Sequence, residues 1–135
     1  MKVFVDARSS GRDMFRYMRR EARIVDEFYK KLLSEELFTD VLVLDETIYI
    51  SRKKYRVSYD DTIDFIDTAV IPYVSLLPLG ELEYHKAKIY IKRYNLKPSD
   101  ALHLAVMDNN GITTIATEDV DFDKTHIKRI WFTNY

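Results

Sequence analysis

Short apolar runs alternate with helical segments along this chain, and this alternation limits the possible folds more than any other feature. Residues 2–5, KVFV, form a short apolar run of the kind found in strands buried on both faces. Further runs that predict strands follow at 73–79 (YVSLLPL), 112–117 (ITTIAT) and 128–132 (KRIWF). Strands that alternate with helices predict a parallel α/β sheet with helices on both faces.

The intervening segments carry the periodicity of helices. We expect helices at 59–70, 80–94 and 99–109, and a longer helical region from 11 to about 37 with a break near residue 23. Gly111 lies just after the helix at 99–109, where a left-handed cap belongs. Residues 41–50, VLVLDETIYI, alternate like a strand, but their apolar members also share one helical face. We favour a helix there, capped by Thr39.

The composition is typical of one soluble globular domain, which we expect to span residues 1–135. Hydrophobic residues make up 47% of the chain and charged residues 32%. No run approaches the ~18 apolar residues of a membrane-spanning helix, and the apolar start is too short for a signal peptide. We therefore expect a cytoplasmic protein without membrane contact. The absence of cysteine excludes a disulfide framework and a thiolate metal site.

The net charge of −1 gives no overall signature of nucleic-acid binding, but the positive charges are unevenly distributed. Four arginines recur every three or four residues and therefore share one face of an expected helix: Arg12, Arg16, Arg19 and Arg23. Phe15 and Tyr17 interleave with them. This arginine face is either a solvated helix surface or a surface that binds a partner such as an RNA backbone.

Acidic residues fall where parallel sheets bind ligands, beyond the carboxyl ends of the strands. Asp6 ends the first predicted strand, and the segment TEDVDFD (117–123) follows the strand at 112–117. Asp100 begins the helix that leads into that second strand, so we expect it nearby. Helix capping is the alternative explanation for Asp100, because carboxylates are favoured at helix N-termini.

Other chemical motifs fit the sequence poorly. Asp119, Asp121 and Asp123 resemble the start of a calcium loop, but the glycine and the final glutamate of such a loop are missing. Three glycines in the whole chain leave no glycine-rich phosphate loop. The three histidines are widely spaced, which argues against a zinc site. We interpret His103 as a core residue or as support for a site residue.

A cluster of carboxylates attracts a cation. Two ionised carboxylates about 4 Å apart repel by ~4 kcal/mol at an effective dielectric constant near 20, so several cannot stay ionised together without a cation. At least one of their pKa values should rise in the metal-free protein. Oxygen ligands without cysteine favour Mg²⁺ or Mn²⁺ over Zn²⁺, and such an ion supports phosphodiester hydrolysis.

Four pieces of the sequence together resemble the PIN-domain nucleases, and most of all the toxins of VapBC toxin–antitoxin pairs: VFVDA at 3–7, Glu46, PSDALHLAV at 98–106 and IATEDVDF at 115–122. Their order and spacing cover the whole chain. The resemblance implies a three-layer α/β/α fold with a small, mostly parallel central sheet, and it places Glu46 on a helix. It also implies a Mg²⁺- or Mn²⁺-dependent endoribonuclease that leaves 5′-phosphate and 3′-hydroxyl ends.

Matched piece by piece, the resemblance also implies a site and its partners. The four acids that match the family are Asp6, Glu46, Asp100 and Asp119, and Asp121 is expected to bind metal beside them. The implied partners are an RNA substrate, a small antitoxin and a second copy of the chain. The arginine face then becomes a surface for the RNA or for the antitoxin.

The chain departs from the family directly after its first acid. The family usually has Thr or Ser there, whereas Ala7 and Arg8 follow Asp6 in this chain. Ser9 and Ser10 are the residues that could supply the missing hydroxyl. Two alternatives therefore stay open. One is a PIN-domain ribonuclease of RNA processing or quality control without an antitoxin, and the other is a degenerate PIN domain that binds RNA or protein without cleavage.

Overall fold

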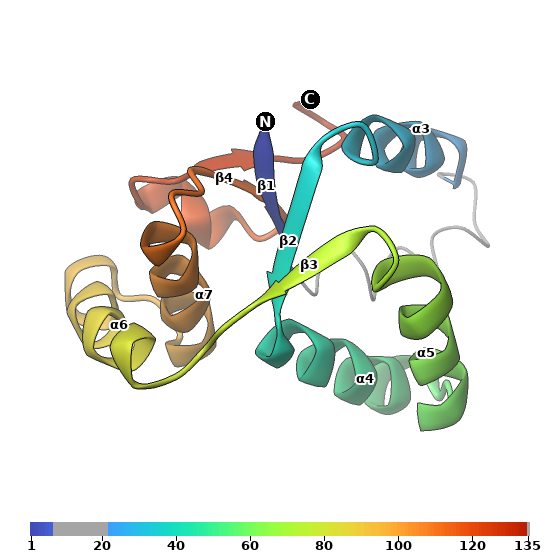
Figure 1. Ribbon diagram of the computed structural model, residues 1–135, viewed down its shortest axis with the longest axis horizontal. Helices are drawn as coiled ribbons and strands as arrows, with labels where there is room; N and C mark the ends of the chain where they lie inside the picture. Colours follow the sequence, from blue (N-terminus) through green and yellow to red (C-terminus); the bar gives the residue numbers. More distant parts are fainter. Residues whose placement is uncertain (7–21, 135) are drawn as a thin grey trace.

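A five-stranded, all-parallel sheet forms the centre of the computed structural model, which describes residues 1–6 and 22–134, with residues 22–26 described by their backbone (Figure 1). The strands in spatial order are β3 (Val74–Leu77), β2 (Glu36–Asp40), β1 (Lys2–Val5), β4 (Thr114–Ala116) and β5 (Lys128–Ile130). Val3 aligns with Leu37 on one side and with Thr114 on the other. β1 is therefore the central strand, and the carboxyl ends of all five strands lie at one edge.

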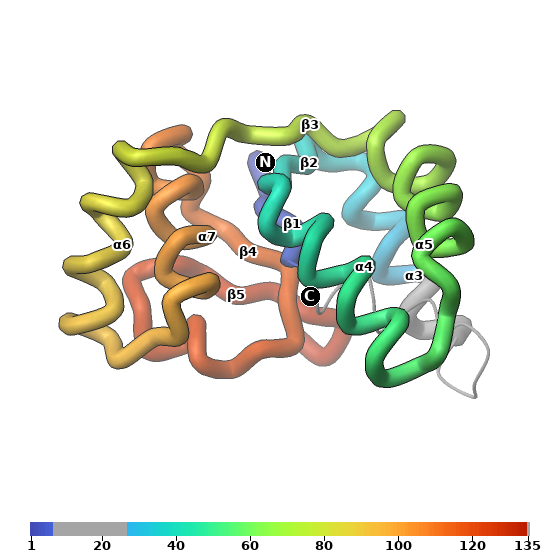
Figure 2. Tube along the Cα trace, turned by 90° about the horizontal axis from the view of Figure 1, so that it is seen from below, coloured from blue at the N-terminus to red at the C-terminus, as the bar shows by residue number. Residues whose placement is uncertain are grey.

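Helices cover both faces of this sheet, so the predicted three-layer α/β/α fold is confirmed. The helices among the described residues are α3 (Ala22–Leu32), α4 (Val41–Tyr55), α5 (Tyr59–Phe65), α6 (Glu81–Tyr94) and α7 (Pro98–Asn109). Two short turns complete the list, the π-helical η1 (Ile66–Val70) and the 3₁₀ turn η2 (Val120–Lys124). Figure 2 shows β1 between α4 and α7 when the molecule is viewed from below.

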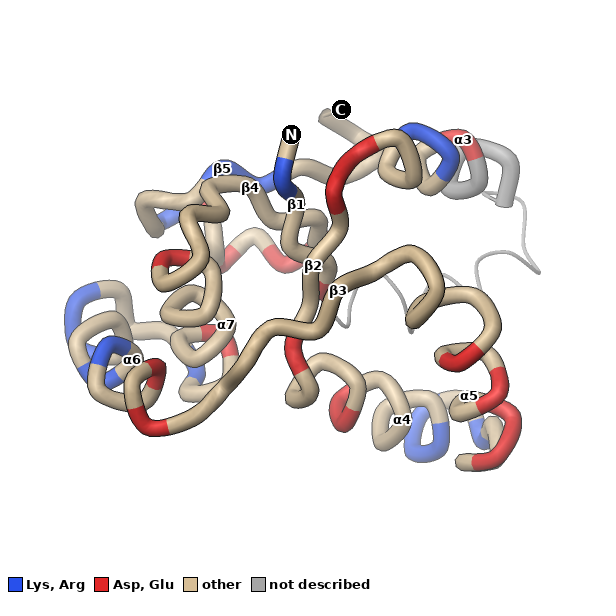
Figure 3. Tube along the Cα trace, in the orientation of Figure 1, with Lys and Arg blue, Asp and Glu red and all other residues tan. Residues whose placement is uncertain are grey.

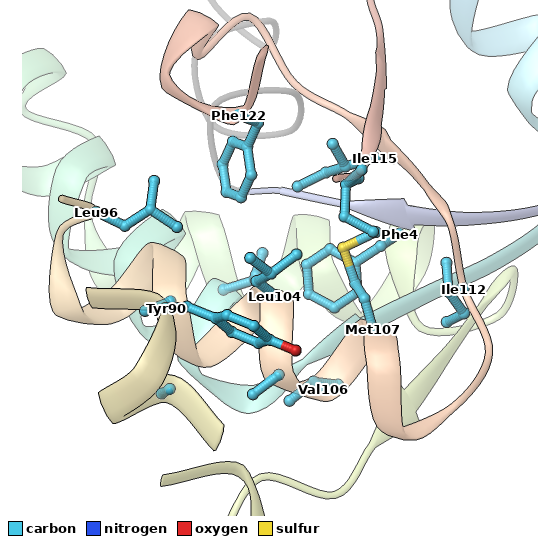
Figure 4. Close-up of a cluster of buried hydrophobic side chains, with 14 residues drawn as sticks. Phe4, Tyr90, Leu96, Leu104, Val106, Met107, Ile112, Ile115 and Phe122 are labelled. Atoms are coloured by element: carbon cyan, nitrogen blue, oxygen red, sulfur yellow. The ribbon is translucent and has the colours of Figure 1, made fainter. Parts of the chain in front are cut away.

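Alternate residues of β1 supply the two halves of the core, as the pleat of a strand requires. Phe4 packs with Leu104 and Met107 of α7 in one cluster (Figure 4), while Val3 and Val5 pack in the other, which holds residues of α3. None of these five side chains exposes more than 8% of its surface. The prediction of a first strand buried on both faces is confirmed.

The prediction of a helical region that continues to about residue 37 is wrong at its end. α3 stops at Leu32, and residues 36–40 form β2. Turn hydrogen bonds from Ser34 N to Lys31 O and from Glu35 N to Leu32 O end the helix. The apolar pair that follows in β2 continues the spacing of the helix, so the pattern alone hides the change to a strand.

The helix predicted for the ambiguous segment is confirmed as α4, but its predicted cap is wrong. Asp40 is the N-cap, and its Oδ1 accepts a hydrogen bond from Val43 N at 3.0 Å. Thr39 is the last-but-one residue of β2 and donates its hydroxyl to Val5 O at 2.8 Å. A carboxylate is among the best N-caps because it accepts a hydrogen bond from a free helix N–H and its negative charge is stabilised by the positive end of the macrodipole.

The remaining expected elements are present within a few residues of their predicted ends. α5 with η1, α6 and α7 match the three predicted helices, and β3, β4 and β5 match the three later strands. Gly111 has φ +66°, which confirms the predicted left-handed residue after α7. Within residues 1–6 and 22–134, no helix combines the length and the apolar character needed to cross a bilayer.

The core around α7 makes a quantitative prediction. Leu104 is fully buried, so Leu104→Ala should lower the free energy of unfolding by about 2–5 kcal/mol, through lost transfer energy and the cavity left behind. Leu82 is 77% exposed, and Leu82→Ala should change it by less than ~0.5 kcal/mol. Urea denaturation of both variants measures the difference. Equal effects of the two substitutions would contradict the described core.

Candidate functional site

Five acidic residues that the sequence places in the site lie at the carboxyl edge of the sheet. Asp6 follows β1, Glu46 is on α4, Asp100 is in the first turn of α7, Asp119 follows β4, and Asp121 is in η2. They fall into two groups with ligand atoms within 4.8 Å of one another: Asp6 and Glu46 with His103, and Asp100 with Asp119 and Asp121. The fold therefore brings together residues that are 115 positions apart in the chain.

The two groups interact electrostatically through Asp100. The pKa of Asp100 is raised to about 7, mainly by burial and in addition by the charges of Asp6 and Asp119. The positive charge of His103 acts in the opposite direction, while Glu46 adds to the increase. This is the shift expected when neighbouring carboxylates lose water and share a small volume.

One oxygen of Asp100 has no hydrogen-bond partner within the described part of the chain. Its Oδ2 is buried, and the whole residue exposes 6% of its surface. A buried anionic oxygen without a partner costs free energy, so its presence requires an explanation. A cation bound among the carboxylates would supply the missing partner, and the residues of the site fit a metal for that reason.

A threonine at the end of β4 orders two of the acids. Thr117 donates its hydroxyl to Asp6 Oδ2 at 2.9 Å and accepts a hydrogen bond from Asp119 N at 3.1 Å. Asp119 Oδ1 in turn accepts from Asp121 N at 3.0 Å. Thr117 thus supplies a hydroxyl to the first acid, the group that Ala7 cannot provide. Ser9 and Ser10, the residues predicted to supply such a hydroxyl, lie outside the described residues.

An arginine braces the loop that carries Asp119 and Asp121. Arg129 of β5 donates from Nε and Nη2 to the two carboxylate oxygens of Asp123, at 2.8 and 3.1 Å. Its Nη1 also donates to Thr117 O at 3.3 Å. A two-pronged arginine–carboxylate contact is more rigid than a single hydrogen bond. The loop between β4 and β5 is therefore held at both ends.

His103 connects the site to a residue that sequence analysis missed. Its Nδ1 lies 2.7 Å from Asp40 Oδ2, and its Nε2 lies 3.1 Å from Glu46 Oε1 and 3.9 Å from Asp6 Oδ1. Burial is the largest single effect and would lower the pKa of His103, but the hydrogen bonds to Asp40 and Glu46 and the charges of Asp40 and Asp6 together raise it to about 10. The imidazole is thus cationic at neutral pH and partly offsets the acidic charge.

The sequence indicates one of the two roles of Asp40 but not the other. Asp40 stands directly before a helical pattern, where an aspartate indicates an N-cap. Nothing in the sequence indicates its second role, because its partner His103 is 63 residues away. The interpretation of His103 as support for a site residue fits its contact with Glu46.

Three of the arginines predicted to bind RNA, Arg12, Arg16 and Arg19, lie outside the described residues. Arg23 is the second residue of α3, and its side chain is not described. The geometry of the site therefore rests on the acidic residues, His103, Asp40 and Thr117.

A comparison with models of protein families shows which family this chain belongs to. The model of the PIN domain matches residues 14–128. This chain belongs to the PIN-domain family. The predicted family is confirmed, and the acidic edge described above lies in the part of the fold that the sequence motifs had indicated.

Solved structures of VapC toxins and VapBC complexes share the fold. VapC20 of Mycobacterium tuberculosis, described as a toxin that cleaves the sarcin–ricin loop, has a TM-score of 0.71 and 17% identity over 90% of this chain and 92% of its own. DNA-bound VapBC of Salmonella typhimurium has a TM-score of 0.70, 13% identity and 98% coverage of both chains. VapBC-1 of nontypeable Haemophilus influenzae has a TM-score of 0.69, 16% identity and 98% and 99% coverage. No curated protein matches the chain by sequence.

The raised pKa of Asp100 predicts a pH-dependent effect on stability. A carboxyl whose pKa rises from 3.8 when unfolded to about 7 when folded destabilises the protein fully above pH 7 and not at all below pH 3.8. Asp100→Asn removes this charge, so it should raise the melting temperature of the metal-free protein at pH 8, and much less at pH 5. Thermal melts in the presence of a chelator measure both differences.

The control for this prediction is Asp64→Asn, since Asp64 is exposed on α5. It should leave the melting temperature nearly unchanged at both pH values. A lower melting temperature of Asp100→Asn at pH 8 would show instead that the carboxylate stabilises α7 as a helix cap.

Proposed function

We propose that this chain is a divalent-metal-dependent endoribonuclease and the toxin of a toxin–antitoxin pair. The observation that carries the proposal is the buried Asp100 carboxylate, one oxygen of which has no partner among the described residues, set among four other acids at the carboxyl edge of a PIN fold. A structural cluster would be expected to satisfy its buried oxygens within the protein. This cluster needs a cation to do so.

The proposed metal ligands are the five acids of the site: Asp6, Glu46, Asp100, Asp119 and Asp121. Oxygen-rich ligation of this kind suits Mg²⁺ or Mn²⁺. An ion held there would acidify a water molecule and polarise a phosphoryl oxygen, which phosphodiester hydrolysis requires. The contribution of the chain is to keep these carboxylates ordered: Thr117 holds Asp6 and Asp119, and His103 holds Glu46.

Catalysis is favoured over a degenerate, non-catalytic domain by Thr117. The departure at Ala7 removes a hydroxyl that the family usually places next to the first acid. The Thr117 hydroxyl lies 2.9 Å from Asp6 Oδ2, so the first acid is still oriented by a hydroxyl. The ordered first acid supports an active enzyme.

The toxin role and the partners rest on the structural neighbours. Two of the three structures described above are VapBC complexes, and one of these is bound to DNA. By analogy with these complexes we propose an antitoxin partner. From the sequence we also propose a homodimer, a cytoplasmic location and a single domain over residues 1–135. A PIN-domain ribonuclease that acts without an antitoxin is the alternative, and the presence of a short open reading frame next to the gene distinguishes the two.

The RNA substrate is proposed to meet a basic surface next to the acids. On α4, Tyr49 follows Glu46 by three residues and Lys53 follows Tyr49 by four, so all three share one helix face. The Lys53 ammonium lies 5.5 Å from the centre of the exposed Tyr49 ring. A cation beside an exposed aromatic ring suits an RNA single strand, which offers phosphates and bases. Figure 3 shows basic residues towards the C-terminal end of α4.

The arginine face at 12–23 is proposed as a second contact with the RNA, on the helical spacing of Arg12, Arg16, Arg19 and Arg23. An alternative role for this face is to hold the antitoxin. Both roles are sequence-based, and they differ in their effect on the salt dependence of RNA binding.

The proposed activity predicts a metal effect on both stability and RNA cleavage. Millimolar Mn²⁺ should raise the melting temperature by about 8–11 °C if its concentration is a hundred times the dissociation constant, since such binding adds ~2.7 kcal/mol. The same ion should support cleavage of single-stranded RNA to fragments with 5′-phosphate ends. Asp6→Asn should lose both effects, because it removes a carboxylate from the proposed metal site.

Asp64→Asn serves as the control, because it removes an exposed charge from α5 and should keep both effects. Asp100→Asn should remain folded and lose cleavage. The proposed function fails if the wild type shows neither a thermal shift nor cleavage with Mn²⁺ or Mg²⁺. A thermal shift without cleavage of any RNA would favour the degenerate, binding-only domain.

The basic surfaces predict a weaker salt dependence of RNA binding in charge-removal variants. Removing one bound phosphate should reduce the slope of log K against log salt concentration by about 0.7 for a single strand. Lys53→Ala should show this reduction, and Arg16→Ala with Arg19→Ala should show about 1.4 because it removes two contacts, in binding titrations on a non-cleaving Asp100→Asn background.

Lys88→Ala is a matched control for Lys53→Ala. Lys88 lies 5.0 Å from the centre of the exposed Tyr84 ring at the same spacing of four residues, but on α6, well separated from α4 in Figures 1 and 2. Lys88→Ala should leave the slope of log K against log salt concentration unchanged. Loss of antitoxin binding by the double arginine variant, with an unchanged slope, would assign the arginine face to the antitoxin.

A further inference from the structure

A buried chain of hydrogen bonds runs from the N-cap of α4 through α7 to the proposed metal site. Asp40 Oδ1 accepts from Val43 N, Asp40 Oδ2 lies 2.7 Å from His103 Nδ1, and His103 Nε2 lies 3.1 Å from Glu46 Oε1. Neither the side chain of Asp40 nor that of His103 is exposed to solvent. The network links three elements: the end of β2, α4 and α7.

We infer that Asp40 and His103 are positioning residues that hold the Glu46 carboxylate in place for metal binding. The inference rests on the proposed function, since it assigns a role toward the proposed metal. It goes beyond that function because Asp40 and His103 do not belong to the acidic set that the sequence motifs indicated.

Glu46 needs such support more than Asp6 or Asp119. Its side chain is 25% exposed, and a glutamate has one more rotatable bond than an aspartate. By contrast, Asp6 and Asp119 are buried and receive hydrogen bonds from Thr117 and the backbone. Fixing a long side chain costs conformational entropy, and a bond already made in the metal-free protein meets that cost before the ion binds.

The ring of His103 is suited to this role by its shape. Its two nitrogens point in different directions and therefore reach acceptors on two different elements, Asp40 and Glu46. The ring also packs on Phe4 of the central strand, with ring centres 5.5 Å apart, so its plane is fixed from the side. With no solvent exposure, water cannot replace either hydrogen bond.

The position of His103 on α7 gives the network a second consequence. Asp100 and His103 are three residues apart on that helix, and both are buried. The same helix therefore supplies an acid to one group of the site and orders Glu46 in the other. The Asp40 carboxylate fixes α4 relative to α7 because it bonds to both. Loss of the network should separate the two groups of ligands.

Two substitutions at His103 separate the two hydrogen bonds. The amide nitrogen of asparagine lies near the position of Nδ1, and that of glutamine near the position of Nε2. His103→Asn should keep the bond to Asp40 and lose the bond to Glu46. His103→Gln should keep a donor for Glu46.

The measurement is Mn²⁺ affinity, from titrations followed by electron paramagnetic resonance on the folded full-length chain. His103→Asn should weaken Mn²⁺ binding by about 10–100-fold, the usual effect of losing a residue that orients a metal ligand. His103→Gln should restore most of the affinity. With Glu46→Gln already present, His103→Asn should have little additional effect, because the carboxylate that it positions is gone.

Thr47→Val is the matched structural control. Thr47 is buried on the same helix and donates to Val43 O at 2.8 Å, and it lines a small apolar cavity with Val5 and Ile66. It should lower the melting temperature without weakening Mn²⁺ binding. A merely structural role of His103 would give the same result for His103→Asn, and this would overturn the inference.

Asp40→Asn provides an independent test if His103→Asn fails to fold. Its amide oxygen can still cap α4 at Val43 N, while its amide group replaces the carboxylate that faces His103 Nδ1. Weaker Mn²⁺ binding by folded Asp40→Asn supports the inference, and unchanged binding overturns it. Absence of Mn²⁺ binding by the wild type would overturn the proposed function itself, whereas equal binding by wild type and variants overturns only the positioning role.

Discussion

The parallel pairing of β1 with β2 and β4 is the constraint on which the rest of the molecule depends. Because the three strands run in one direction, their carboxyl ends deliver Asp6, Asp40 and Thr117 to the same edge of the sheet. The hydrogen bond from Asp6 N to Ala116 O continues this pairing one residue beyond β1. The site is therefore built on the hydrogen-bonded centre of the sheet, and its remaining acids sit on helices and turns.

Placing many carboxylates at that edge is unfavourable, and the fold offsets the cost unequally. Asp6 and Asp119 receive hydrogen bonds from Thr117 and the backbone, and Glu46 receives one from His103. Asp100 keeps a buried oxygen without a partner in residues 1–6 and 22–134, and a pKa raised to about 7. The negative charge of Asp100 is thus not offset by hydrogen bonds as the charges of the other three acids are. Such an uncompensated carboxylate is typical of a site that binds a cation.

The sequence predicts the architecture well because short apolar runs and helical periodicity are local signals. β2 is missed because Leu37 and Phe38 continue the apolar spacing of α3, and only pairing with β1 and β3 makes the segment a strand. The acids of the site were indicated by motifs and by their place after strands. The Asp40–His103 contact could not be predicted from the sequence, because it joins residues 63 positions apart. Their local patterns indicate only a helix cap and a core histidine.

The site also explains why an aspartate stands in the first turn of a buried helix. A capping carboxylate accepts hydrogen bonds from free helix N–H groups, and such bonds lower its pKa. The N-cap of α7 is Lys97, which makes no side-chain capping bond, and Pro98 leaves one N–H fewer to satisfy. Asp100 instead has a raised pKa and a buried oxygen that accepts no hydrogen bond from the described part of the chain. Its charge therefore opposes folding in the metal-free protein, and this favours the metal binding that we propose over helix stability as the reason for its position.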